Sequence, residues 1–103
     1  MIKTGGSNVS PAEVETALVE LPAVREAFVF GIPAGERGED VAAVVVPGGS
    51  SAVEITALTA SLRDMLSSYK IPRHLRVVEA ADLPKLPTGK ADLASLRDLF
   101  EGA

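Results

Sequence analysis

Six consecutive apolar residues, Val41 to Val46, constrain the fold of this 103-residue chain more than any other segment. A strand that is apolar at every position is typical of a sheet covered on both faces. An earlier segment, Val24 to Phe30, is rich in β-branched and aromatic residues and predicts a second strand. The polar connection between them, Gly31 to Asp40, favours antiparallel pairing of the two strands.

Apolar residues at helical spacing predict the helices that cover this sheet. Ser10-Pro11-Ala12-Glu13 is a capping-box pattern, and it predicts a helix from Pro11 to about Glu20. A second helix is expected over about Thr56 to Ser67, and a third around Leu93 to Phe100. The expected fold is an α/β domain of the α+β type. It has a small, mostly antiparallel sheet of about three strands, with three helices packed on it.

The C-terminal part adds a short strand, Leu75 to Glu79, and an extended loop, Asp82 to Lys90. Two prolines restrict the backbone of this loop and Gly89 permits a turn, which together direct Lys90 away from the domain. A lysine ammonium is a compact charge suited to a phosphate or carboxylate oxygen. The alternative is an ordinary solvated lysine on a proline-rich surface loop.

Composition excludes several classes of function. Ten basic and fourteen acidic residues give a net charge of −4, so no basic surface for nucleic acid is expected. There is no cysteine and one histidine, His74, which argues against a metal centre and favours a structural role for that histidine. No apolar run is long enough to span a membrane, and no signal peptide is evident. We therefore expect a cytoplasmic domain.

Four segments occur together in the order of a known family. They are the glycine segment Ile2-Lys3-Thr4-Gly5-Gly6-Ser7-Asn8-Val9-Ser10-Pro11-Ala12-Glu13-Val14-Glu15, then Gly31-Ile32-Pro33 with Arg37-Gly38-Glu39, then Tyr69-Lys70-Ile71-Pro72-Arg73, and finally Leu83-Pro84-Lys85-Leu86-Pro87-Thr88-Gly89-Lys90. The chain resembles the C-terminal domain of adenylate-forming enzymes of the ANL superfamily. This superfamily includes acyl-CoA synthetases, the adenylation domains of nonribosomal peptide synthetases, and luciferase.

The resemblance implies that residues 1–103 form a mobile C-terminal domain whose partner is an N-terminal adenylation domain outside this chain. That partner would bind a carboxylic acid and ATP, including most of the contacts to Mg²⁺. The acid would first become an acyl-adenylate with loss of pyrophosphate. After a large rotation of the C-terminal domain, the thiol of CoA would attack the adenylate.

The same resemblance assigns roles to individual residues. Lys90 corresponds to the adenylation lysine. Gly5 and Gly6 correspond to the glycines that line the pantetheine channel, although paired glycines by themselves also suit a tight turn. Three arginines match basic positions that contact CoA phosphates: Arg37, Arg63 and Arg73. Asn8 stands where some relatives have a nucleotide-binding arginine, so that role is not transferred.

Three functions remain open from the sequence. The first is the C-terminal domain of an acyl-CoA synthetase, with a fatty acid as the expected substrate. The second is the C-terminal subdomain of a peptide-synthetase adenylation domain, but Tyr69-Lys70 and Thr88 favour the CoA ligase. The third is a stand-alone CoA-binding or regulatory module without turnover. The isolated domain is expected to be inactive in each case.

Overall fold

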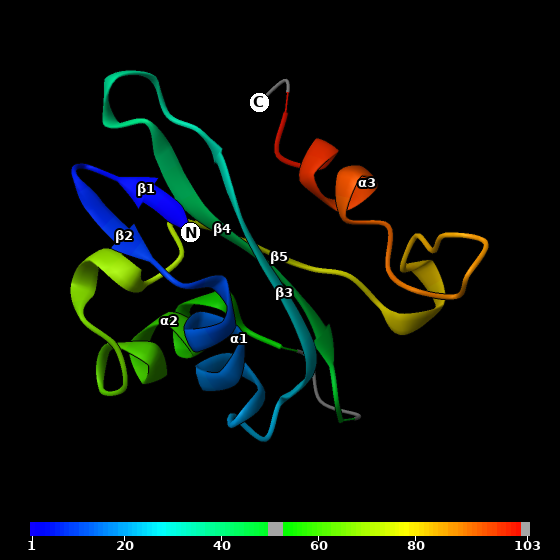
Figure 1. Cartoon of the computed structure of the whole chain (residues 1–103). Helices are drawn as coiled ribbons and strands as arrows, with labels where there is room; N and C mark the ends of the chain where they lie inside the picture. Colours follow the sequence, from blue (N-terminus) through cyan, green and yellow to red (C-terminus); the bar gives the residue numbers. More distant parts are fainter. Residues whose placement is uncertain (50–52, 102–103) are drawn as a thin grey trace.

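The apolar run forms the centre of a three-stranded sheet in the computed structural model, which describes residues 1–49 and 53–101. Strand β4 (Glu39–Pro47) lies between β3 (Val24–Pro33) and β5 (His74–Val77). The pair β3–β4 is antiparallel, with Val29 opposite Ala43, as predicted from the connection between them. The pair β4–β5 is parallel. The three-stranded sheet is therefore confirmed, and its third strand joins parallel to the central one (Figure 1).

Side chains of β4 alternate between two apolar cores. Val41, Ala43 and Val45 lie in the core shared with the first two helices. Ala42 and Val44 lie in a second core on the opposite face of the sheet. All five are buried, because successive residues of a strand point to opposite faces and both faces are covered. This confirms that the strand is covered on both sides.

Two helices cover one face of the sheet and the third covers the other (Figure 1). Helices α1 (Pro11–Val19) and α2 (Ile55–Arg63) pack on the first core, and α3 (Leu93–Asp98) inserts Leu96 into the second. Helix α2 ends before the predicted Ser67. Its last turn tightens, since the Met65 N–H donates to the carbonyl of Leu62 three residues earlier.

A short hairpin at the N-terminus was not predicted. Strands β1 (Ile2–Thr4) and β2 (Ser7–Val9) are antiparallel and are joined by the two-residue turn Gly5-Gly6. Both glycines have positive φ angles, 55° and 84°, as the favoured two-residue hairpin turn requires. Ile2 and Val9 are buried in the first core, which anchors the hairpin to the domain.

The N-cap half of the capping box predicted at the start of α1 is present, whereas the Glu13 carboxylate binds Nζ of Lys70 instead of the Ser10 N–H. The Ser10 hydroxyl accepts a hydrogen bond of 3.3 Å from the Glu13 N–H. We expect Ser10→Ala to lower the free energy of unfolding by about 1 kcal/mol, because this N–H would lose its side-chain acceptor. Ser10→Asp, which supplies another acceptor, is the matched control. Equal urea midpoints for the alanine variant and the parent chain would contradict this account.

Candidate functional site

The glycine turn is held against the connection between β3 and β4. The Gly5 N–H donates to the carbonyl of Arg37 at 3.0 Å, and the Lys3 N–H donates to Oε1 of Glu39 at 3.0 Å. Arg37 ends the short 3₁₀ helix η1 (Gly35–Arg37). The segment Arg37-Gly38-Glu39 therefore fixes the position of the glycine turn, and this explains structurally why the two sequence motifs occur together.

A pocket of about 320 Å³ lies between this hairpin, η1 and the segment that contains the 3₁₀ helix η2 (Ser68–Lys70). Its lining residues come from the glycine segment, from Arg37 and from the segment around Tyr69: Thr4, Gly5, Ser7, Arg37, Ser68, Tyr69 and Arg73. The fold thus brings Gly5, Arg37 and Arg73 together from three distant parts of the sequence. We call this the glycine pocket.

The turn leaves free space beside the backbone. A Cβ built on Gly5 or on Gly6 meets no atom within 4 Å. The bare backbone at Gly5 is part of the pocket wall, so a side chain at that position would project into space that a ligand could occupy. Gly6 is adjacent in the turn but is not among the lining residues.

A buried carboxylate lies beneath the two arginines of the pocket. Arg37 binds Asp40 through Nε at 3.2 Å and through Nη2 at 2.9 and 3.0 Å. The Nε atom of Arg73 is 4.0 Å from Oδ1 of Asp40. Nε2 of His74 is 3.0 Å from Oδ2, so the lone histidine contacts this carboxylate. No sequence pattern singled out Asp40.

The surroundings of Asp40 favour its charged form. Burial acts to raise the pKa of this carboxyl, but hydrogen bonds from His74 and Arg37, with their positive charges, outweigh burial and lower the pKa below 3.8. Because the pKa is lower in the folded chain, ionised Asp40 stabilises the fold above about pH 4. That contribution is lost as the pH falls through the folded-state pKa.

Arg63, another predicted site residue, lies outside the glycine pocket, and so does Asn8, to which no role was assigned. Arg63 is exposed in the last turn of α2 and is not among the lining residues. Asn8 is exposed in β2, opposite Lys3. The structure therefore groups Arg37 and Arg73 with the glycine turn but does not place Arg63 in the same wall.

Lys90 lies on a second, separate feature, a small hairpin in the C-terminal loop. Lys85 and Ala91 pair as an antiparallel bridge. The Leu86 carbonyl accepts from the Gly89 N–H, and the Leu86 N–H donates to the Lys90 carbonyl, both at 2.8 Å. Gly89 has a φ of 90°, which suits glycine and closes the turn. The loop is therefore ordered by backbone hydrogen bonds.

The side chain of Lys90 is exposed, and within residues 1–49 and 53–101 it makes no ion pair or side-chain hydrogen bond. The hairpin projects from the edge of the domain opposite to β1 and β2, at the right of Figure 1. Lys90 and the glycine pocket are thus at opposite ends of the domain. Since the ammonium group is not tied into this domain, it is available to a molecule outside it.

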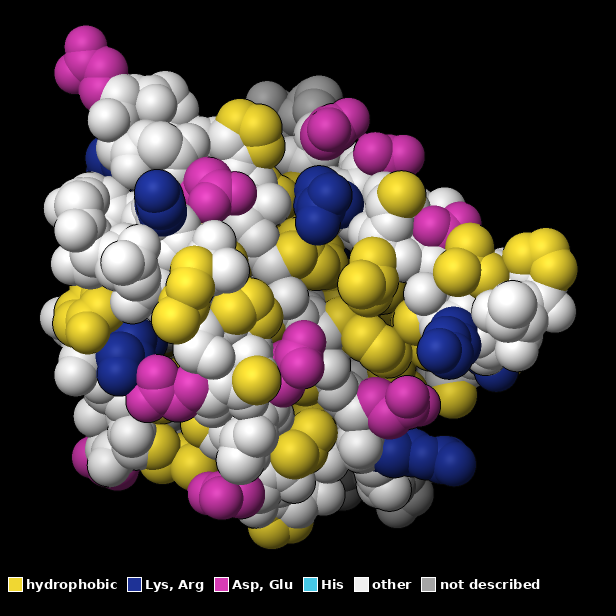
Figure 2. All heavy atoms as spheres, viewed as in Figure 1, with side chains coloured by type: hydrophobic (Ala, Val, Ile, Leu, Met, Phe, Trp, Pro, Cys, Tyr) yellow, Lys and Arg dark blue, Asp and Glu magenta, His cyan; other side chains and the backbone are white. Residues whose placement is uncertain are grey.

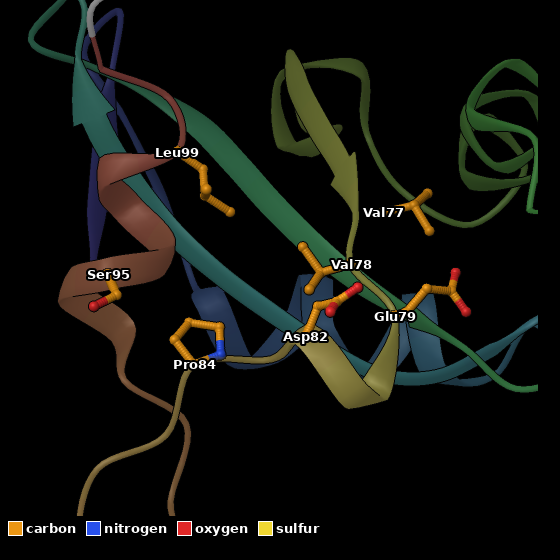
Figure 3. Close-up of a pocket in the computed structure, with 7 residues that line it drawn as sticks. All are labelled: Val77, Val78, Glu79, Asp82, Pro84, Ser95 and Leu99. Atoms are coloured by element: carbon orange, nitrogen blue, oxygen red, sulfur yellow. The ribbon is translucent and has the colours of Figure 1, made fainter.

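An apolar pocket of about 500 Å³ lies near the base of the Lys90 hairpin. Figure 3 shows Leu99, directly after α3, and Val78, which follows β5, facing the same space, with Pro84 below them. Apolar side chains also gather beside the projecting loop in the space-filling view (Figure 2). No sequence pattern indicated this pocket, because it forms between the α3 region and the segment after β5.

Neither a cluster of metal ligands nor a membrane-spanning helix is found in the part of the chain that the structure describes. No group of three or more His, Asp or Glu side chains is arranged to hold a metal ion there. No helix among the described residues has the length and apolar character needed to cross a bilayer.

The chain thus combines a small sheet covered on both faces with a glycine pocket and an exposed lysine on a projecting hairpin. The model of the family described as "AMP-binding enzyme C-terminal domain" matches residues 13–90. The chain therefore belongs to this family. The matched region runs from Glu13 to Lys90 and thus includes the tip of the hairpin.

Known proteins of this group are similar to the chain over nearly all of its length. A medium/long-chain-fatty-acid–CoA/3-oxocholest-4-en-26-oate–CoA ligase of Mycolicibacterium smegmatis is 37% identical over 97% of the chain. The structure of a Mycobacterium tuberculosis fatty acyl CoA synthetase superposes with a TM-score of 0.81 at 36% identity, over 97% of this chain and 19% of that one. ATP-bound MatB from Rhodopseudomonas palustris gives 0.86 at 31% identity, over 99% and 20%.

The chain spans only about a fifth of these longer proteins, 18% in the Mycolicibacterium ligase. The similarity therefore defines the family of this domain and its fold.

Proposed function

We propose that this chain is the mobile C-terminal domain of a cytoplasmic acyl-CoA synthetase that converts a carboxylic acid, most simply a fatty acid, to acyl-AMP and then to acyl-CoA. The observation that carries the proposal is the exposed Lys90 on its ordered hairpin. Further support comes from the glycine pocket, which combines bare backbone with two arginines as a CoA channel would require. The relatives described above are ligases and synthetases that act with CoA or bind ATP.

Lys90 acts in the first half-reaction by electrostatics. When the carboxylate attacks the α-phosphate of ATP, negative charge is shared among the oxygens of both groups. A positioned ammonium group neutralises part of that charge and aligns the reactants, without transferring a proton. As the family resemblance implies, we assign most contacts to the Mg²⁺ that accompanies ATP to the N-terminal adenylation domain.

The second half-reaction uses the opposite end of the domain. Gly5 and Gly6 would line the path of the pantetheine arm, and Arg37 and Arg73 would face the CoA phosphates from the same pocket. Arg63, which lies outside this wall, would contact a more distant part of the cofactor. Because Lys90 and the glycine pocket are at opposite ends (Figure 1), the domain must reorient between the two half-reactions.

Mixing experiments test the division of labour between domains. The chain alone should show no ATP-dependent ligation, because the proposal assigns the acid and ATP sites to the N-terminal adenylation domain. Adding the accompanying N-terminal adenylation domain, with ATP and acid, should produce pyrophosphate release above that of the N-terminal domain alone. Ligation by the purified chain without a partner would contradict the proposal. Tight CoA binding without any stimulation of pyrophosphate release would favour a regulatory CoA-binding module instead.

A further inference from the structure

We propose that Asp40 is a positioning residue for the CoA phosphates, holding the guanidinium groups of Arg37 and Arg73 in the wall of the glycine pocket. This inference rests on the proposed function, since it takes CoA as the ligand. The carboxylate does not itself line the pocket. It acts through the two arginines, which do.

Asp40 is buried, whereas the two arginines that it contacts are exposed. The side chain of Asp40 is 7% exposed, whereas those of Arg37 and Arg73 are 49% and 63% exposed. Asp40 therefore lies beneath two cations that reach the surface. Its bonds use Nε and Nη2 of Arg37, which leaves both N–H groups of Nη1 for a ligand. A two-point contact fixes the plane of a guanidinium as well as its position.

The fold alone gives little reason for a carboxylate at this position. Asp40 is the one buried polar or charged residue found in the described part of the chain, and the six residues that follow it are all apolar. Burying a carboxylate is costly unless it is paired, and a well-packed apolar side chain often serves stability equally well. What the carboxylate provides, and an apolar residue would not, is a fixed orientation of the Arg37 guanidinium and a negative charge that attracts Arg73 from 4.0 Å.

The charges around Asp40 also allow a second role, simple neutralisation, which predicts the opposite effect on anion binding when the Asp40 charge is removed. Arg37, Arg73 and, when protonated, His74 all face this carboxylate. If Asp40 served only to neutralise them, removing its charge would make the pocket more positive and would tighten the binding of an anion. If it orients the arginines, removing the charge weakens that binding although the net charge becomes more favourable.

The experiment uses the protein that joins this chain to its adenylation domain, and it starts from preformed acyl-adenylate so that only thiol transfer is measured. CoA is compared with pantetheine, which has the same thiol arm without the nucleotide phosphates. We expect Asp40→Asn to raise the KM for CoA about tenfold or more relative to the KM for pantetheine, the range for loss of hydrogen bonds between charged groups. Asp98→Asn, at an exposed position of α3, removes the same charge elsewhere and should leave both KM values unchanged.

Two further variants separate positioning from general damage. In Arg37→Lys the charge remains but the two-point contact is lost, so the KM for CoA should again rise relative to that for pantetheine. The double variant Asp40→Asn with Arg37→Lys should cost less than the sum of the single effects, since both act through one contact. If Asp40→Asn fails to fold, Arg37→Lys by itself still tests the two-point contact.

Three results would overturn the inference: an unchanged or lower KM for CoA in Asp40→Asn, an equal rise for both thiols, or an unchanged KM for CoA in Arg37→Lys. Failure of the proposed function would be seen separately. In that case CoA would not be a substrate of the parent protein, or pyrophosphate release would not require this domain.

Discussion

Replacing Lys90 with alanine should slow acyl-adenylate formation by roughly 100-fold or more, while thioester formation from preformed acyl-adenylate should change far less. The expected size is typical for removing one positioned electrostatic contact from a transition state. The lysine hairpin and the glycine pocket lie at opposite ends of the domain, so the two half-reactions depend on different residues. Pyrophosphate release and single-turnover thiol transfer measure them separately.

Lys85 provides the matched control for this prediction. It is exposed on the same hairpin, where it pairs with Ala91. Lys85→Ala removes an identical side chain from the same hairpin. Pyrophosphate release should remain within about threefold of the parent rate, the scale of weak exposed charge effects. If both alanine variants slowed adenylation equally, the effect would belong to the hairpin's charge and Lys90 would lose its assigned role.

Placing a leucine at Gly5 should produce the opposite pattern. The side chain would enter the glycine pocket, obstruct the thiol arm and slow thioester formation by about 100-fold, while adenylation stays near the parent rate. Within this domain the added Cβ meets no atom within 4 Å, so the block would act on the ligand and its channel. Single-turnover transfer from acyl-adenylate to CoA is the measurement.

Backbone strain is the competing explanation for such a loss, and Gly35 controls for it. Gly35 has a φ of 62°, close to the 55° of Gly5, and it too has open space at its Cβ. It is not among the residues that line the glycine pocket. Gly35→Leu therefore imposes similar strain, about 1–2 kcal/mol, without filling the channel. Equal losses of thiol transfer in the two leucine variants would show that strain, and not obstruction, limits the reaction.

The sequence predicted those parts of the fold whose signals are local. The apolar run within β4 could only be satisfied by cover on both faces, and both cores are present. The capping-box pattern correctly predicted that α1 begins at Pro11. The predicted end of α2 was wrong. The apolar spacing continues to Leu66, but the helix ends at Arg63, after which the backbone forms tighter turns.

Features that depend on contacts between distant segments could not be predicted from local sequence patterns. Each strand of the N-terminal hairpin has three residues, too few to show alternation, although Gly5-Gly6 between Thr4 and Ser7 fits a two-residue turn. The parallel pairing of β5 depends on the path of the chain through α2. In the sequence Asp40 belongs to a polar connection. Its burial can be recognised only in the structure, where Arg37 and His74 contact its carboxylate.

The central claim is that the Lys90 ammonium group reaches a reaction centre held by another domain, and the absence of cysteine from this chain allows a direct test. A Lys90→Cys chain would be alkylated with 2-bromoethylamine, which rebuilds a lysine-like amine, or with iodoacetamide, which adds no charge. Each product would then be mixed with the N-terminal adenylation domain, ATP and acid. We predict that the aminoethylated chain restores pyrophosphate release and that the uncharged adduct does not. Equal rates for the two adducts would contradict a role for the positive charge at this position.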